Sequence, residues 1–254
     1  MPTIPTRYGA VNYTFIGAGK PLILIHGNTY TAATQERLAK RFADEHAVYC
    51  LDLLSHGYSA RPAGLFSTAY FAMQGAAVAD VLAGLFPDQA VPVFGMSAGG
   101  ISALNAICEQ PERISALILD GVFRQVTQQT VEAHHQSTAN MSPTWDRYMR
   151  GQHGEEWWPV LSREVERTIE ELAAAGTVVA PCLEQIKVPV LVFQGGKDGF
   201  VPDAQAHAVV SQISGARMVY EAEAGHLLAW RNPAIFRERV RRFLHEQEHK
   251  DGGR

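Results

Sequence analysis

The sequence has few cysteines, no marked excess of either charge and no long apolar run. Its 254 residues include 3 cysteines and carry 22 basic against 26 acidic side chains, for a formal net charge of −4. This balance provides no long-range attraction for nucleic acid or anionic lipid. No run approaches the roughly 18 apolar residues of a membrane span, and the N-terminus lacks the apolar core of a signal peptide. The composition therefore predicts a protein with neither nucleic-acid nor membrane partners.

The cysteines also constrain the class of protein. Cys50, Cys108 and Cys182 are widely spaced and odd in number. This pattern indicates neither a disulfide framework nor a zinc site. Because a reducing compartment fits such cysteines best, we expect a cytoplasmic location. His134, His135 and His153 also lack metal-ligand spacing, and we expect neither a metal nor a cofactor.

Short apolar runs alternate with amphipathic segments along much of the chain. The inner runs are typical of buried parallel strands, and those at either end of the series are looser. Together they predict strands at residues 8–16, 22–25, 47–51, 91–94, 115–119, 188–193 and 217–220. Helical spacing predicts helices over residues 31–45, 68–86, 98–109 and 233–245. This order predicts an α/β fold with a mostly parallel sheet flanked by helices, because strands that alternate with helices are joined by right-handed crossovers.

The alternation stops after Gly121. Residues 122–187 have a helical and polar pattern, contain several tryptophans and include no recognisable strand. Their length and amphipathic character indicate an insertion over the sheet rather than an independent domain. We therefore predict an α/β core of residues 1–121 and 188–254 with residues 122–187 inserted as a helical cap. The last residues, 246–254, are expected to be a frayed tail.

One short motif carries the first chemical signal. Gly95-Met-Ser97-Ala-Gly99 joins a predicted strand to a predicted helix. This is the G-x-S-x-G nucleophile elbow, in which the central serine occupies a strained turn with its hydroxyl exposed. Small neighbours allow the strand and the helix to approach closely. The motif alone is common, so its interpretation depends on the rest of the chain.

A serine nucleophile needs a base to accept its proton and an acid to orient that base. Asp198 follows one later strand, and His226 follows the last strand of the series. Because open parallel sheets gather such groups at the carboxyl ends of their strands, we expect both residues to lie near Ser97. Asp120 also follows a strand and is a rival for the orienting acid.

With these residues in order, the chain resembles the α/β-hydrolase family from about residue 8 to residue 245. The motifs that carry the resemblance are His26-Gly27, Asp52 to Ser59, Gly95 to Gly99, Gly195 to Asp198 with Val201-Pro202, and Gly225-His226. The resemblance implies that Ser97 is the nucleophile, His226 the general base and then acid, and Asp198 the orienting carboxylate. It also implies an oxyanion hole made by the backbone N–H groups of Asn28 and Ala98.

Several residues indicate which groups within this family the chain resembles. An Asn at position 28 resembles the halide-holding Asn of haloalkane dehalogenases, but those enzymes and epoxide hydrolases need a carboxylate nucleophile, which Ser97 does not supply. Ser55 stands where the common pattern has Gly, so a less tight turn is expected there. The run from Met96 to Leu104, the tryptophan-rich cap and Val201-Pro202 are similar to the biphenyl-hydrolase-like group that includes valacyclovir hydrolase. In the latter an Asp after the nucleophile reads an amino group; Ala98 argues against that requirement.

These inferences predict a serine carboxylesterase that cleaves a small to medium apolar ester through an acyl-enzyme. The side chains expected to line the substrate pocket are Tyr58, Phe123, Trp145, Trp157, Trp158, Leu227 and Trp230. Thioester, acyl-homoserine lactone or carbon–carbon bond cleavage by the same triad stays open. A non-catalytic ligand-binding protein on the same fold is a more distant alternative. The expected partner is a small-molecule ester or related acyl compound, and the sequence does not predict the oligomeric state.

Overall fold

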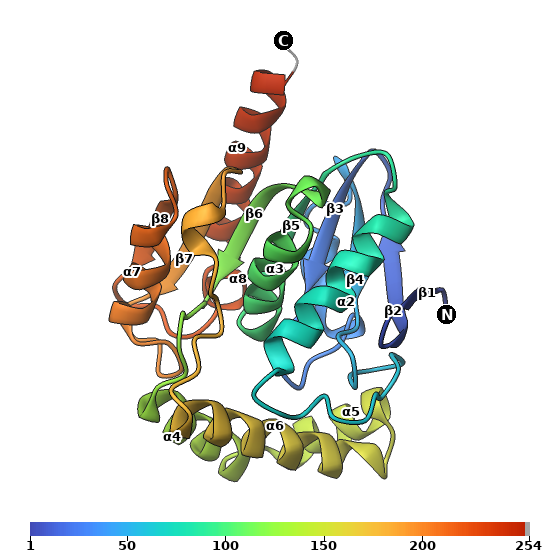
Figure 1. Cartoon of the computed structure of the whole chain (residues 1–254), viewed down its shortest axis with the longest axis vertical. Helices are drawn as coiled ribbons and strands as arrows, with labels where there is room; N and C mark the ends of the chain where they lie inside the picture. Colours follow the sequence, from blue (N-terminus) through green and yellow to red (C-terminus); the bar gives the residue numbers. More distant parts are fainter. Residues whose placement is uncertain (252–254) are drawn as a thin grey trace.

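The computed structural model describes the backbone of residues 1–251 and the side chains of residues 1–247. Within residues 1–251, an 8-stranded sheet has the order β1-β2-β4-β3-β5-β6-β7-β8 (Figure 1). The strands are β1 (Thr3–Thr6), β2 (Gly9–Ile16), β3 (Lys20–Ile25), β4 (His46–Leu51), β5 (Val91–Met96), β6 (Ile114–Asp120), β7 (Val190–Gly195) and β8 (Arg217–Glu221). β2 pairs antiparallel with both β1 and β4, and the other pairings are parallel.

Alternation along the central strands divides the core into two layers. On β3, Ile23 and Ile25 join one buried cluster, whereas Leu22 and Leu24 join the other. Helices that cover the first layer are α2 (Tyr70–Leu85), α3 (Ala98–Glu109) and α7 (Asp203–Gln212); those that cover the second are α1 (Glu36–Ala39), α8 (Leu228–Arg231) and α9 (Pro233–Asp251). Because both faces are covered, the central strands are continuously apolar rather than alternating in polarity.

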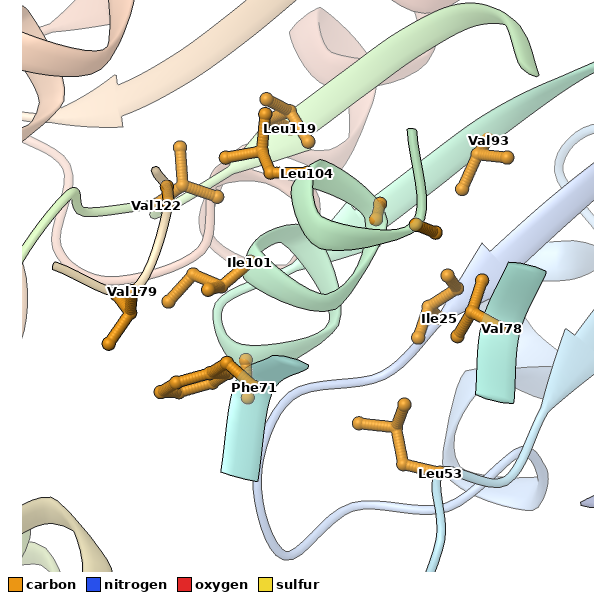
Figure 2. Close-up of a cluster of buried hydrophobic side chains, with 14 of the residues drawn as sticks. Ile25, Leu53, Phe71, Val78, Val93, Ile101, Leu104, Leu119, Val122 and Val179 are labelled. Carbon is orange, nitrogen blue, oxygen red and sulfur yellow. The ribbon is translucent and has the colours of Figure 1, made fainter. Parts of the chain in front are cut away.

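Helix α3 packs into the first layer, between the sheet and the segment that leads to β7. Figure 2 shows Ile101 and Leu104 of this helix near Leu119 of β6, Val122 and Val179. Ile101, Leu104, Leu119 and Val122 are fully buried. Burial of such side chains stabilises the fold by about 1.5–3 kcal/mol each. This packing fixes the helix whose first turn follows Ser97.

Between β6 and β7 the chain forms three α-helices within the described residues, α4 (Gln128–Ala139), α5 (Pro143–His153) and α6 (Trp157–Ala174), and a short 3-10 helix at Leu183–Gln185. We call residues 122–187 the α4–α6 segment. Thr127 caps α4 through a capping box, and Ser142 caps α5 ahead of a proline in its first turn. The three helices lie together beyond one end of the sheet, on the side to which the parallel strands point (Figure 1).

Some predicted elements differ from the structure. Residues 8–16, whose loose alternation is typical of an edge strand, form a strand that lies one position inside the edge, because β1 pairs along its outer side. The helix expected over residues 31–45 is reduced to a 3-10 turn and four residues of α1. Thr31 and Thr34 each bond to the other's backbone there, and such local bonds compete with helix formation.

The C-terminal part of the structure also differs from the prediction. Helix α9 continues to Asp251, so the fraying expected from residue 246 does not begin there, and residues 252–254 lie outside the described part. Helix α7 was not expected from the sequence. Within residues 1–251, none of the helices combines the length and the apolar character that a membrane-spanning helix needs.

The cysteine prediction is wrong in one respect. Cys108, near the end of α3, forms a disulfide with Cys182, which precedes β7, and their Cα atoms are 6.0 Å apart. The two residues are separated by 74 positions in the chain, so their contact depends on the fold and not on local spacing. Cys50 is buried on β4 with a free thiol. The cytoplasmic location stays a prediction.

Candidate active site

Ser97 lies in a strained turn between β5 and α3. Its φ is 49° and its ψ is −120°, a left-handed backbone conformation that is rare for a residue with a side chain. Backbone hydrogen bonds maintain the turn: the Ser97 N–H donates to the Asp120 carbonyl at 2.8 Å, and the Ser97 carbonyl accepts from Gly100 at 2.9 Å. The residues around Ser97 are buried and Ser97 is half-buried, so its side chain is the one that reaches solvent.

The glycines of the elbow permit close packing that no other residue would allow. A Cβ at Gly99 would lie 2.3 Å from the Ile25 carbonyl oxygen, and one at Gly95 would lie 2.5 Å from the Gly100 Cα. Both distances are shorter than van der Waals contact, so a side chain at either position would push the elbow away from β3 or α3. Gly27 lies on the other side, where a Cβ would be 3.3 Å from the Ser97 Cβ.

His226 and Asp198 lie together, 28 residues apart in sequence. The Nδ1 of His226 is 2.7 Å from Oδ2 of Asp198, whose side chain is 1% exposed. The other carboxylate oxygen accepts the backbone N–H groups of Phe200 at 2.9 Å and Val201 at 3.0 Å. Because an ionised carboxylate can only accept, Nδ1 must carry the proton, which leaves Nε2 as an acceptor.

Asp120 does not take the position of the orienting acid. Its two oxygens accept the backbone N–H groups of Leu228 at 3.0 Å and Ala229 at 2.9 Å. Complete burial raises the pKa of Asp120 to about 6. These bonds hold the start of α8, which begins two residues after His226. Asp120 therefore stabilises the segment that follows His226, and Asp198 is the residue in contact with the imidazole.

Two further groups restrict the His226 ring. A Cβ at Gly121 would lie 2.7 Å from its Cε1, so the absence of a side chain at this position makes room for the imidazole. The ring of Phe200 lies 4.8 Å from that of His226 between centroids. Leu227, the next residue, has a left-handed φ of 66°. The imidazole is thus enclosed by a carboxylate, a glycine and an aromatic ring.

The predicted oxyanion donors are on two loops beside Ser97. Ala98 is the first residue of α3, and Asn28 follows Gly27. Among the described residues, no protein acceptor bonds to the backbone N–H of either one. The side-chain oxygen of Asn28 accepts the Tyr70 hydroxyl at 2.7 Å, which fixes the orientation of its amide.

A cluster of neighbouring imidazoles supports the Asn28 loop. We call His26, His56 and His153 the histidine cluster; the ring centroids of His56 lie 5.1 Å from His26 and 5.9 Å from His153. His56 Nε2 accepts the Thr29 N–H at 3.1 Å, and His153 Nε2 donates to the Thr29 carbonyl at 2.9 Å. Burial lowers the pKa of His26 and of His153 to about 4 and that of His56 well below its usual range. The cluster is therefore neutral near pH 7.

A cavity of about 700 Å³ lies between the sheet and the α4–α6 segment. Ser97, His226 and Asn28 all line it. The predicted pocket residues that line it are Trp145, Leu227 and Trp230. The structure therefore brings the elbow, the imidazole and these apolar side chains to one space.

The other four predicted pocket residues lie elsewhere. Tyr58 is 61% exposed and faces a separate surface hollow. Phe123 is buried in the core, edge-on to Phe71. The Trp158 ring is buried, stacks on His153 and donates its N–H to Asp146 at 2.7 Å.

Trp157 also lies outside the cavity. Its N–H donates to the Ser55 carbonyl at 2.8 Å, and the Arg61 guanidinium lies 4.6 Å above its ring. These contacts pack the α4–α6 segment against the loop after β4. Because an aromatic residue serves equally well in packing and in binding, the residue type alone did not separate the two roles.

The cavity also has lining residues that the sequence prediction missed. Tyr30 follows the Asn28 loop, Phe200 lies within the Asp198 motif, and His134 lies on α4. Phe200 could have been predicted, because it lies between Asp198 and Val201 of the motifs described above. His134, Ser137 and Thr138 lie three and four positions apart on α4 and line the cavity together, and no role in binding was predicted for them from the sequence.

Among the side chains of residues 1–247, no group of three or more His, Cys, Asp or Glu residues is arranged to hold a metal ion. The groups described above are the Ser97 hydroxyl and the His226 imidazole, which line the cavity, and the Asp198 carboxylate in contact with that imidazole.

These features define the class of protein. Residues 22–239 match the model of the alpha/beta hydrolase family, and the chain therefore belongs to that family. Solved structures agree: a serine hydrolase involved in carbazole degradation, the CarC enzyme, has a TM-score of 0.80 at 22% identity and covers 96% of this chain and 98% of its own. At this identity the likeness shows the fold.

Curated relatives are more specific. A pimeloyl-[acyl-carrier protein] methyl ester esterase of Aliivibrio salmonicida is 28% identical over 91% of this chain and 95% of its own length. Serine hydrolase BPHL of Mus musculus is 24% identical over 92% of this chain and 82% of its own length. The chain is thus a hydrolase by family, with esterases and serine hydrolases among its relatives.

Proposed function

We propose that this protein is a serine hydrolase that cleaves a carboxylic ester of a small to medium substrate through an acyl-enzyme. The observation that carries the proposal is the 2.7 Å contact between His226 Nδ1 and Asp198, with Ser97 lining the same cavity as the imidazole. The names of the relatives, an esterase and a serine hydrolase, support the same chemistry.

In this mechanism His226 Nε2 accepts the hydroxyl proton of Ser97 while the oxygen attacks the ester carbonyl. The negative charge that develops on the carbonyl oxygen is met by the N–H groups of Asn28 and Ala98, each worth about 3–4 kcal/mol of the barrier. The imidazolium then returns the proton to the departing alkoxide, and an alcohol leaves. Water, deprotonated by the same imidazole, attacks the acyl-serine and releases the acid. Asp198 holds the imidazole in the tautomer that this sequence requires.

We also propose that the α4–α6 segment is a cap over the reaction site. Met141, between α4 and α5, Trp145 of α5 and Val165 of α6 line the same cavity as Ser97. A cap of this kind excludes bulk water from the acyl-enzyme and sets the size of the substrate. Together with Leu227 and Trp230, these side chains give the cavity a partly apolar wall.

The direct test combines covalent labelling with turnover. A fluorophosphonate should label the wild-type protein and Ser211→Ala, whose serine is exposed on α7, and should not label Ser97→Ala. Ser97→Ala should also lose hydrolysis of p-nitrophenyl butyrate by a factor of at least about 10³ without a change in thermal stability. Turnover by Ser97→Ala at the wild-type rate would refute the proposal. A panel of thioesters, lactones and diketones, compared with the ester by kcat/KM, then separates ester cleavage from the alternatives.

A further inference from the structure

The α4–α6 segment contributes polar as well as apolar side chains to the wall of the cavity. On α4, His134, Ser137 and Thr138 line the cavity; on α6, Ser162 and Glu166 do so. Residues three and four apart lie on the same face of a helix, so the hydrogen-bonding groups of each helix share the face that lines the cavity. Ser137 and Thr138 are exposed on that face, whereas His134 is half-buried.

Within the described side chains, these groups are largely without protein partners. No protein atom forms a hydrogen bond with either ring nitrogen of His134 or with the hydroxyls of Ser137, Thr138 and Ser162. Glu166 is the exception, because its carboxylate lies 3.4 Å from His135. The wall therefore holds free donors and acceptors that face the same space as Ser97.

His134 is the member of this wall that can be placed relative to the proposed chemistry. Its ring lies 5.2 Å from that of Phe200, edge-on, and Phe200 lies 4.8 Å from His226. His134 is thus one aromatic ring away from the imidazole at the reaction site. At about 1.2 Å per chain atom, a substrate arm of six to eight atoms covers that separation.

The charge state of His134 indicates which groups it can bind. Burial, with the nearby His226 and His135, lowers the pKa of His134 to about 4. The imidazole is therefore neutral near pH 7 and has one donor and one acceptor nitrogen. A carboxylate is a poor partner here, because Glu166 adds negative charge to the same wall.

We propose that His134 is a specificity residue that hydrogen-bonds an uncharged polar group, a hydroxyl or a carbonyl, on the substrate arm that extends from the scissile ester under α4. This inference rests on the proposed esterase function and replaces a purely apolar substrate by one that carries such a group about six to eight atoms from the ester. The other polar side chains that line the cavity from α4 and α6 supply further hydrogen bonds along the arm.

The experiment compares esters that differ by one hydroxyl. Ethyl 6-hydroxyhexanoate is matched with ethyl heptanoate for an acyl arm, and 6-hydroxyhexyl acetate with heptyl acetate for an alcohol arm. The measured quantity is the ratio of kcat/KM for the hydroxylated ester to that for its methyl isostere, followed by acid release at constant pH. Monoethyl adipate, with a terminal carboxylate, should be the poorest acyl substrate.

The variants separate a hydrogen bond from a packing effect. In at least one series, His134→Phe should lower the ratio by about 3- to 10-fold, the value of one hydrogen bond. His134→Gln keeps a donor and an acceptor and should retain part of the preference. His207→Phe, the same change at an exposed position on α7, should leave the ratio unchanged. If His134→Phe does not fold, His134→Ala is measured in its place.

Failure of this inference differs from failure of the proposed function. If the wild-type protein turns over the isosteres and His134→Phe leaves the ratio unchanged in both series, His134 has no such role while the esterase function stands. If the wild-type protein turns over none of the esters and resists the fluorophosphonate, the proposed function itself is refuted.

Discussion

Replacing Asp198 by Asn tests the orientation of the proposed base. Oδ1 of Asp198 accepts two backbone N–H groups, from Phe200 and Val201, while Oδ2 accepts the proton on His226 Nδ1. An Asn at this position must keep its oxygen on the two backbone donors, so its NH₂ group faces the imidazole. A donor opposite Nδ1 forces that nitrogen to accept. The proton then moves to Nε2, which can no longer take the proton of Ser97.

The size of the effect follows from this tautomer change. Loss of the correct tautomer in a serine triad lowers kcat by about 10⁴-fold. That factor corresponds to about 5.5 kcal/mol of activation free energy. Because Asn and Asp have the same shape, KM and thermal stability should change little. Steady-state hydrolysis of p-nitrophenyl butyrate gives kcat and KM, and thermal unfolding checks the fold.

A matched control uses a neighbouring carboxylate. Asp203, at the start of α7, accepts the Tyr220 hydroxyl at 2.8 Å and does not contact His226. Asp203→Asn should keep kcat within about twofold of wild type. A folded Asp198→Asn protein with kcat within tenfold of wild type would refute the tautomer argument and the assignment of Asp198.

Three further predictions concern position, pH and oxidation. Gly121→Ala should lower kcat by at least about tenfold in a folded protein, because the new Cβ would displace the His226 ring, and an unchanged kcat would contradict that packing. In the histidine cluster, the pKa of His26 and that of His153 each fall from 6.5 to about 4 on folding, so the unfolded chain binds more protons between these pH values. Urea unfolding should therefore show stability lost as pH falls below 6.5, by up to about 3 kcal/mol for each imidazole; a flat profile from pH 7 to pH 5 would count against the cluster. Reduction of the Cys108–Cys182 disulfide, which closes a loop of 74 positions, should cost about 4 kcal/mol and lower Tm, and a Tm insensitive to reductant would show that the bond does not form.

The periodicity of the sequence was a good guide to the central fold. The apolar runs at residues 22–25, 91–94 and 115–119 fall on β3, β5 and β6, and the helix expected over residues 98–109 is α3 as observed. These elements are covered on both faces, which gives their sequences an unambiguous apolar character. The predicted α/β fold and the resemblance to the α/β-hydrolase family are confirmed.

Elements at the margin were harder to foresee. β1 is four residues long with a mixed burial pattern, and α1 retains four residues of the longer helix that was expected. Short elements carry little periodic signal, and their conformation depends on neighbours that sequence spacing does not reveal. The chemical roles assigned to Ser97, Asp198 and His226 stay predictions that the variants above test.

The sequence by itself determined the layered α/β architecture and the order of the serine, aspartate and histidine motifs, because strand burial and tight glycine turns leave local patterns of residues. Only the tertiary structure decided which carboxylate contacts His226, which aromatic residues face the cavity and which cysteines pair. An Asp, a Trp or a Cys has the same local signature in either role. Its partner comes from distant parts of the chain that packing brings together.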